Sequence, residues 1–143
     1  MAKAMSRLLL DTGPLVAMID EGDQNHDRCV AWFKENQAQY VTTEAVLTEA
    51  MHLLKLSYRA QSACVGFFIS GAVELHPVSM NDLKLINDLM RQYQNVPMDY
   101  ADATLVNLAN QLKCYSIFTL DVTDFSIYRP ARNIAFTIYP PPL

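Results

Sequence analysis

The chain has 143 residues, of which 51% are hydrophobic and 18% charged, and its net charge is −4. This length and composition fit one globular domain with a sizeable core and exclude an intrinsically disordered chain. The acidic balance argues against a basic protein that coats nucleic acid. It does not argue against a nuclease, because carboxylates that bind a metal ion add to the negative count.

Strand and helix signals alternate along the chain. The apolar run at residues 8–10 predicts a buried strand over residues 7–10, which ends at Asp11 and is followed by a turn into a helix. Thr43 and Ser79 precede two later helices as N-caps. After the first helix, the predicted helices cover residues 26–36, 44–56, 61–70, 81–93 and 100–113. After the first strand, the predicted strands cover residues 40–42, 73–78, 116–120 and 134–138.

Strands separated by helices favour an α/β fold with a mostly parallel central sheet flanked by helices on both faces. The helices between residues 43 and 70 form a helical hairpin on that plan. We expect residues 1–143 to form a single domain, with a flexible proline-rich tail from about residue 139.

The cysteines and the apolar runs predict the compartment. Three cysteines lie far apart without Cys-x-x-Cys spacing, which is typical of free thiols in a reducing cytoplasm. The apolar run that ends at Asp11 is too short for a signal peptide, and no run approaches the length of a transmembrane helix. We therefore expect a cytoplasmic protein that makes no membrane contact.

Acidic residues recur where ligands bind in parallel α/β sheets. Asp11 and Asp121 each follow an apolar strand, and the carboxyl ends of such strands line the ligand crevice. Glu49 lies at the edge of an apolar helical stripe, and Asp102 shares the inward side of its helix. Converging carboxylates repel each other unless a cation joins them, and hard oxygen ligands suit Mg²⁺ or Mn²⁺. The pattern predicts a metal-dependent enzyme that acts on phosphate esters.

Each acid also has a structural interpretation. Asp11 before Gly-Pro is ordinary turn chemistry, and Glu49 fits a solvated helix face. Asp99 is well placed as an N-cap, which is the interpretation we favour for it, and Asp124 either caps a turn or joins the cluster. The three histidines have no metal-ligand spacing and are interpreted as packing or surface residues.

Four segments in order, residues 8–17, 42–50, 99–106 and 118–125, resemble the motifs of PIN-domain proteins. Many small prokaryotic members are VapC-like toxins, ribonucleases that an antitoxin holds in check. The resemblance implies a parallel-sheet α/β fold, a Mg²⁺- or Mn²⁺-dependent endoribonuclease and a homodimer.

The resemblance also implies roles for individual residues. The acids that match the family's positions, and that we expect to be catalytic, are Asp11, Glu49, Asp102 and Asp121. Either Asp121 or Asp124 supplies the fourth metal ligand. Asp99, and Asp124 if it is not that ligand, are candidates for metal contacts just outside the direct ligands. Thr119 matches a hydroxyl position near the metal in some members. Lys55, Arg59, Arg129 and Arg132 are candidates for RNA phosphate contacts.

Other functions stay open from the sequence. They are a flap-type DNA nuclease, an RNA-processing nuclease, a catalytically inactive partner-binding module and a phosphoaspartyl phosphatase, although Gly13 stands where the last would have a second aspartate. A homodimer, or an antitoxin segment, is expected to cover apolar helices in the first half of the chain. The residues behind that expectation are Trp32, Phe33, Leu53, Leu54, Phe67 and Phe68.

Overall fold

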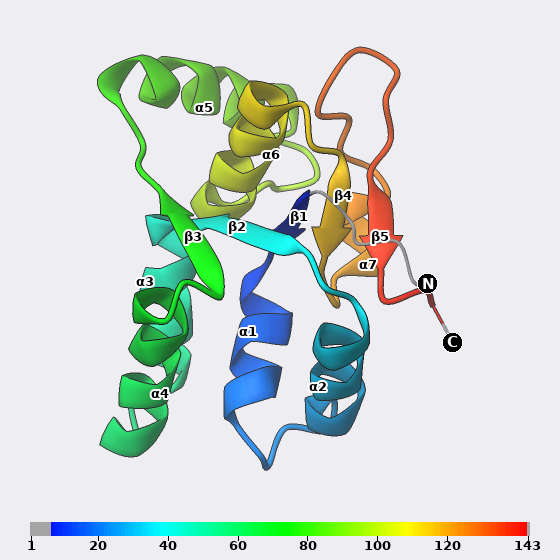
Figure 1. Cartoon of the computed structure of the whole chain (residues 1–143). Helices are drawn as coiled ribbons and strands as arrows, with labels where there is room; N and C mark the ends of the chain where they lie inside the picture. The colour runs from blue at the N-terminus through cyan, green and yellow to red at the C-terminus, as the bar shows by residue number, and fades with distance from the viewer. Residues whose placement is uncertain (1–6, 143) are drawn as a thin grey trace.

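The computed structural model of the protein describes residues 7–142 and contains one fully parallel five-stranded sheet, in the order β3-β2-β1-β4-β5 (Figure 1). Its strands are β1 (Arg7–Leu10), β2 (Gln39–Thr43), β3 (Val73–His76), β4 (Ser116–Phe118) and β5 (Thr137–Tyr139). The predicted α/β fold with a parallel sheet is confirmed.

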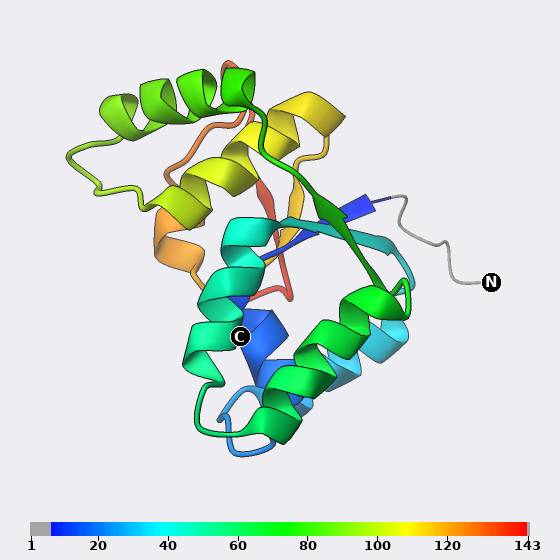
Figure 2. The same ribbon diagram turned by 90° about the vertical axis from the view of Figure 1, so that its left-hand side faces the viewer.

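Helices cover both faces of this sheet. The helices are α1 (Thr12–Ile19), α2 (His26–Glu35), α3 (Glu44–Leu53), α4 (Tyr58–Ile69), α5 (Met80–Gln92), α6 (Tyr100–Leu112) and α7 (Val122–Phe125). Helices α1 to α4 lie on one side of the sheet and α5 and α6 on the other, as both ribbon views show (Figures 1 and 2). Among residues 7–142, no helix is long and apolar enough to cross a membrane.

The central strand β1 decides where ligands bind. Leu8, Leu9 and Leu10 have no exposed surface, because β2 and β4 flank the strand and helices cover it above and below. From β1 the chain moves outward to β2 and β3 on one side, then returns to β4 and β5 on the other. The connections after β1 and β4 therefore part in opposite directions, which leaves a crevice at the carboxyl ends of these two strands.

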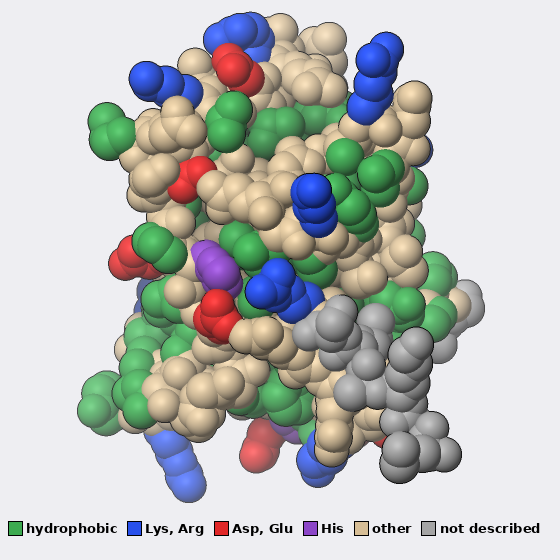
Figure 3. All heavy atoms as spheres, turned by 45° about the horizontal axis from the view of Figure 1, so that its top comes forward, with side chains coloured by type: hydrophobic (Ala, Val, Ile, Leu, Met, Phe, Trp, Pro, Cys, Tyr) green, Lys and Arg blue, Asp and Glu red, His purple; other side chains and the backbone are tan. Residues whose placement is uncertain are grey.

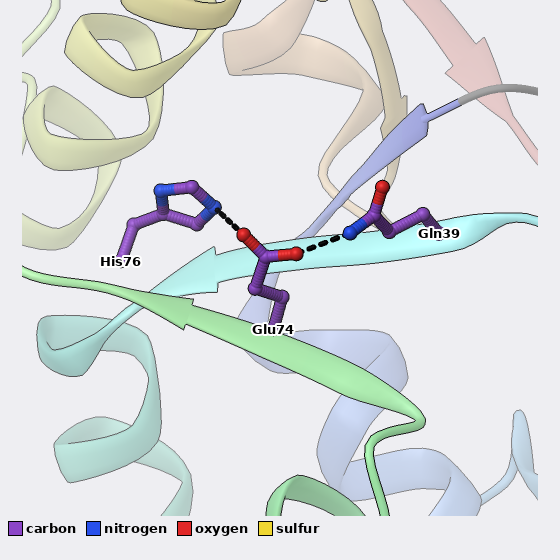
Figure 4. A network of polar contacts seen from close by, with 3 residues as sticks. All are labelled: Gln39, Glu74 and His76. Atoms are coloured by element: carbon purple, nitrogen blue, oxygen red, sulfur yellow. Dashed lines mark hydrogen bonds and ion pairs between the residues drawn. The ribbon is translucent and has the colours of Figure 1, made fainter.

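Polar contacts tie the edge strand β3 to β2. The Glu74 carboxylate accepts a hydrogen bond from the Gln39 side chain, and the His76 Nε2 atom lies 2.8 Å from the other oxygen of Glu74 (Figure 4). His76 therefore pairs with Glu74 along β3, which fits the packing or surface role expected for the histidines.

Helix α5 is fixed to α6 through Asp82. The Ser79 hydroxyl accepts from the Asp82 N–H (3.1 Å), and one Asp82 oxygen accepts from the Ser79 N–H (2.8 Å), which forms a capping box. The other oxygen accepts from the side-chain amides of Asn107, at 3.2 Å, and Gln111 on α6. These bonds, that from the Ser79 backbone first, lower the pKa of the Asp82 carboxyl.

Several predicted boundaries differ from the structure. Helix α3 ends at Leu53 and not at residue 56, and α4 begins at Tyr58, before residue 61, because the Ser57 hydroxyl accepts from the Ala60 N–H and caps it. The last strand covers 137–139 and not 134–138. An Ala131–Ile134 bridge with Asn133 at φ 63° makes residues 131–134 a tight turn.

The proline-rich tail begins later than expected. Tyr139 ends β5, and its ring stacks on Trp32 with centroids 5.0 Å apart. The Arg28 guanidinium donates to the Pro141 carbonyl at 2.8 Å. Flexibility beyond this point stays a prediction, and Leu143 lies outside the described residues.

Most apolar residues that predicted a dimer face are partly or fully buried within the chain. Trp32, Phe33, Phe67 and Phe68 lie against the core, and Leu54 is only 5% exposed. Of the six, only Leu53 is exposed, at 58%. Packing within the chain thus accounts for much of the apolar surface that motivated the expected interface, and the homodimer stays a prediction.

We expect Asp82→Ala to lower the free energy of unfolding by about 1–3 kcal/mol, because it removes an N-terminal cap and leaves buried donors without a partner. Urea denaturation measures this change. Asp88→Ala on the same helix is the matched control. Asp88 is 64% exposed and pairs only with Arg91, so its removal should cost less than about 0.5 kcal/mol. Equal costs for the two variants would contradict the role assigned to Asp82.

Candidate functional site

Asp11 follows β1 directly and caps the next helix. Its N–H donates to the Phe118 carbonyl at 3.0 Å, so the β1–β4 pairing continues to this residue. One carboxylate oxygen accepts from the Thr12 N–H (2.8 Å), and the other accepts from the Thr119 hydroxyl (2.7 Å). These two bonds hold the Asp11 side chain, which is only 8% exposed, in one orientation.

Thr119 joins the ends of β1 and β4. Its hydroxyl donates to Asp11 and at the same time accepts from the Asp121 N–H at 3.0 Å. Asp121 in turn caps α7, since one of its oxygens accepts from the Asp124 N–H at 3.0 Å. One hydroxyl therefore sets the distance between the two strand-end aspartates.

Helix α6 and its N-cap provide two further aspartates. Asp99 is the N-cap, and its carboxylate accepts from the Asp102 N–H at 2.8 Å, which confirms its predicted structural role. Asp102 lies one turn into the helix and is partly buried. Its Oδ2 atom accepts from the Tyr128 hydroxyl at 2.9 Å.

All six predicted acids line one cavity of about 420 Å³ at this edge of the sheet. Carboxylate oxygens of Asp102, Asp121 and Asp124 lie within 4.8 Å of one another. Asp11 and Glu49 line the same cavity outside this group of three. The full lining is Asp11, Thr12, Gly13, Glu49, Leu53, Pro97, Asp99, Asp102, Leu120, Asp121 and Asp124, which includes no Lys, Arg or His.

Glu49 differs from its predicted setting. It was expected to border the core, but its side chain is exposed on α3, between the buried residues Val46 and Ala50. It reaches the cavity from the solvent side. No burial penalty therefore applies to this carboxylate, unlike Asp11.

Burial and repulsion between neighbouring charges raise the pKa of three acids in the cavity, Asp11, Asp102 and Asp124. Burial raises the pKa of Asp11 to about 6, although the bonds from Thr119 and Thr12 oppose the rise. Burial, then the charges of Asp11 and Asp99, raise the pKa of Asp102 to about 8. The pKa of Asp124 also rises, through burial and the nearby Asp121. These carboxylates lack a neutralising cation among the residues that line the cavity.

Two residues at the site were not singled out from the sequence. The Tyr128 hydroxyl donates to Asp102, which lies 26 residues earlier in the chain, so no local sequence pattern indicates this contact. The Thr12 hydroxyl is buried in the cavity wall and has no hydrogen-bond partner within residues 7–142. The available signal for Tyr128 was its spacing of three from Phe125, which indicates a buried ring whose hydroxyl needs a partner.

One predicted RNA contact is engaged elsewhere. The Arg129 guanidinium donates to the carbonyls of Ser126 (2.8 Å), Ile127 (3.2 Å) and Tyr128 (3.0 Å). Arg129 therefore braces the chain after α7. Lys55, Arg59 and Arg132 are exposed, and basic side chains are scattered singly on the face shown in Figure 3.

Comparison with known proteins identifies the family. Residues 8–129 match the PIN domain. The chain belongs to the PIN-domain family. The resemblance of its four motifs to PIN domains is thus confirmed, and the match takes in every acid that lines the cavity.

Individual relatives of this PIN domain are distant in sequence. Ribonuclease VapC26 of Mycobacterium tuberculosis is 26% identical over 135 residues, which are 93% of this chain and 100% of the relative. The crystal structure of M. tuberculosis VapC20, described as a Sarcin-Ricin loop cleaving toxin, has a TM-score of 0.77 at 18% identity and covers 87% of this chain and 98% of that chain. A toxin–antitoxin complex from Klebsiella pneumoniae has a TM-score of 0.59 at 16% identity, with the same coverage. The two structures share the fold.

The raised pKa of Asp102 predicts a pH dependence of stability for this PIN domain in EDTA. The pKa rises from 3.8 in an unperturbed carboxyl to about 8 in the fold. Between these values the folded state binds a proton that the unfolded state has released. The free energy of unfolding should therefore fall as pH rises from about 4 to about 8.

Urea denaturation at a series of pH values measures this slope. Asp102→Asn should flatten it, because the amide stays neutral throughout. Asp88→Asn, at an exposed position of α5, should leave it unchanged. A slope that is the same in Asp102→Asn as in the wild type would show that another group causes it.

Proposed function

We propose that this PIN domain is a divalent-metal-dependent endoribonuclease that hydrolyses RNA phosphodiester bonds, and that it is the toxin of a toxin–antitoxin pair. The observation that carries the proposal is the convergence of six carboxylates on one cavity without a neutralising side chain among its lining residues. The similarity to a relative named ribonuclease VapC26, over nearly the whole chain, supports the same reaction class.

The residues present fit a divalent cation. All close donors are carboxylate oxygens, the ligands that Mg²⁺ and Mn²⁺ prefer. The raised pKa values of Asp11 and Asp102 indicate that the cavity disfavours their charged forms, and a cation would reverse this. The unpartnered Thr12 hydroxyl offers one more oxygen toward bound water.

Asp102, Asp121 and Asp124 would hold the ion, since their oxygens already lie together. A bound divalent ion supplies a Lewis acid that lowers the pKa of an attacking water and offsets charge on the phosphodiester. Asp11, oriented by the Thr119 hydroxyl, lines the same cavity outside this group of three and would add negative charge that favours the ion. Glu49, exposed on α3 beside the same cavity, is placed to accept a proton from water as it attacks phosphorus.

An antitoxin and a second copy of the chain are proposed partners. Leu53 lines the cavity, and beyond it Leu56 and Tyr58 are 96% and 83% exposed at the turn between α3 and α4. A helical antitoxin segment that packs on these residues would also cover the site. The similarity in fold to a chain of a structure described as a toxin–antitoxin complex supports an antitoxin as a partner, and the exposed turn supports its place on the surface.

Light scattering and co-expression test the two partners separately. A homodimer gives twice the chain mass of 16.2 kDa. An antitoxin that binds the α3–α4 turn should lose affinity for Leu56→Ser and keep it for Ile69→Ser, an apolar position that is 82% exposed at the far end of α4. Equal binding to both variants would contradict this docking site.

We expect Asp11→Asn and Asp102→Asn each to lower the rate of single-stranded RNA cleavage by a factor on the order of 10²–10³, since each removes a carboxylate whose charge would help to hold the divalent ion at the reacting centre. EDTA should abolish cleavage by the wild type, and Mn²⁺ or Mg²⁺ should restore it. The measurement is a gel assay on labelled RNA, with a flap DNA substrate in parallel.

Asp88→Asn is the control and should cleave at the wild-type rate. Melting curves in EDTA should show that both site variants fold, because each removes a charge from a repelling cluster. Full activity in both variants would overturn the assignment of these acids to the site. Faster cleavage of flap DNA than of RNA would overturn RNA as the proposed substrate.

A further inference from the structure

Tyr128 connects the site to the aromatic core behind it. The residue follows α7 and has no exposed surface, and it is among the largest fully buried side chains within residues 7–142. Its hydroxyl donates to the Asp102 Oδ2 atom at 2.9 Å. Tyr128 does not line the cavity, so it touches an acid of the site without reaching the substrate.

Neighbouring rings hold the Tyr128 ring in place. The Phe125 ring meets it edge-on, with centroids 5.2 Å apart and planes at 83°, and the Tyr93 ring does so at 5.3 Å and 71°. The Tyr93 hydroxyl itself points elsewhere and accepts from the Arg129 N–H at 2.9 Å. The Arg129 side chain binds the Tyr128 carbonyl. The hydroxyl that reaches Asp102 is therefore rigidly placed.

Asp102 needs such an anchor because its neighbours repel it. Asp99 lies one turn before it, and carboxylate oxygens of Asp121 and Asp124 lie within 4.8 Å of its own. Without a donor on one oxygen, the carboxylate lowers its energy by turning away from these charges. Among residues 7–142, the Tyr128 hydroxyl is the side-chain donor that opposes this rotation.

We infer that Tyr128 is a positioning residue for metal binding, which holds the Asp102 carboxylate in the orientation that faces Asp121 and Asp124. The inference rests on the proposed metal site. Groups that orient metal ligands through hydrogen bonds typically change metal affinity by about 10–100-fold when they are removed.

A purely structural role makes a different prediction. Tyr93 and Tyr128 belong to the same aromatic cluster, and each hydroxyl makes one side-chain hydrogen bond to a neighbour. The Tyr93 hydroxyl accepts from a backbone N–H, whereas the Tyr128 hydroxyl donates to an acid of the site. If the two hydroxyls only satisfy buried polar groups, their removal affects stability alone, and to a similar extent.

The test compares Tyr128→Phe with Tyr93→Phe, each of which removes one hydroxyl and keeps its ring. Mn²⁺ affinity is measured by calorimetry and by the electron paramagnetic resonance of free Mn²⁺. We expect Tyr128→Phe to weaken binding by about 10–100-fold. Tyr93→Phe should stay within about threefold of the wild type, because it keeps the ring that packs on Tyr128 and removes only a hydroxyl whose partner is the Arg129 N–H. Melting curves in EDTA show whether both variants fold.

A Tyr128→Phe variant that binds Mn²⁺ as tightly as Tyr93→Phe would overturn the inference and leave the metal site intact. Wild-type protein that binds no Mn²⁺ at millimolar concentration would instead overturn the metal site itself.

A second measurement keeps the test decisive if Tyr128→Phe fails to fold. We would incorporate 3-fluorotyrosine in place of Tyr128 or, as the control, Tyr93, and titrate each protein with diamagnetic Mg²⁺. The ¹⁹F resonance at Tyr128 should shift, because charge on its acceptor changes, and that at Tyr93 should not. Equal shifts, or none at Tyr128, would refute the positioning role.

Discussion

The constraint on which the rest of this structure depends is the repulsion between carboxylates gathered at the carboxyl ends of β1 and β4. Asp11 and Asp102 are buried enough for their pKa values to rise to about 6 and about 8, so the cluster costs free energy while it lacks a counter-ion. The fold holds the acids against this cost with fixed donors. The Thr119 hydroxyl and the Tyr128 hydroxyl each bind one carboxylate oxygen that would otherwise turn away.

Capping and function are not alternatives at this site. Asp11, Asp99 and Asp121 each accept a hydrogen bond from the N-terminal backbone of a helix, as a cap does, and each also lines the cavity. Because the amino ends of helices favour negative charge, the caps offset part of the repulsion. The cap also fixes the side-chain torsion. The side chain of a residue that begins a helix beside the crevice therefore has its orientation toward the cavity fixed before a ligand binds.

The sequence predicted what depends on local pattern. Apolar runs located the strands, and their alternation with helices predicted the parallel sheet that the structure confirms. The positions of Asp11 and Asp121 after strands were enough to bring them to one crevice. Contacts between distant segments were beyond that pattern. The Tyr128–Asp102 bond, the stacking of Trp32 on Tyr139 and the engagement of Arg129 all depend on tertiary packing. The same packing partly buries most of the predicted dimer face against the core.

The strand order has a consequence for synthesis on the ribosome. Strand β1 is made first but lies at the centre, between β2 and the much later β4. A nascent chain that has reached the end of α4 carries Asp11 and Glu49 without Asp102, Asp121 or the Tyr128 anchor. Phe118, which receives the Asp11 N–H, is also still missing. The site therefore forms only when nearly the whole chain has left the ribosome. A product that terminates at the end of α4 contains two of the acids and has no cavity.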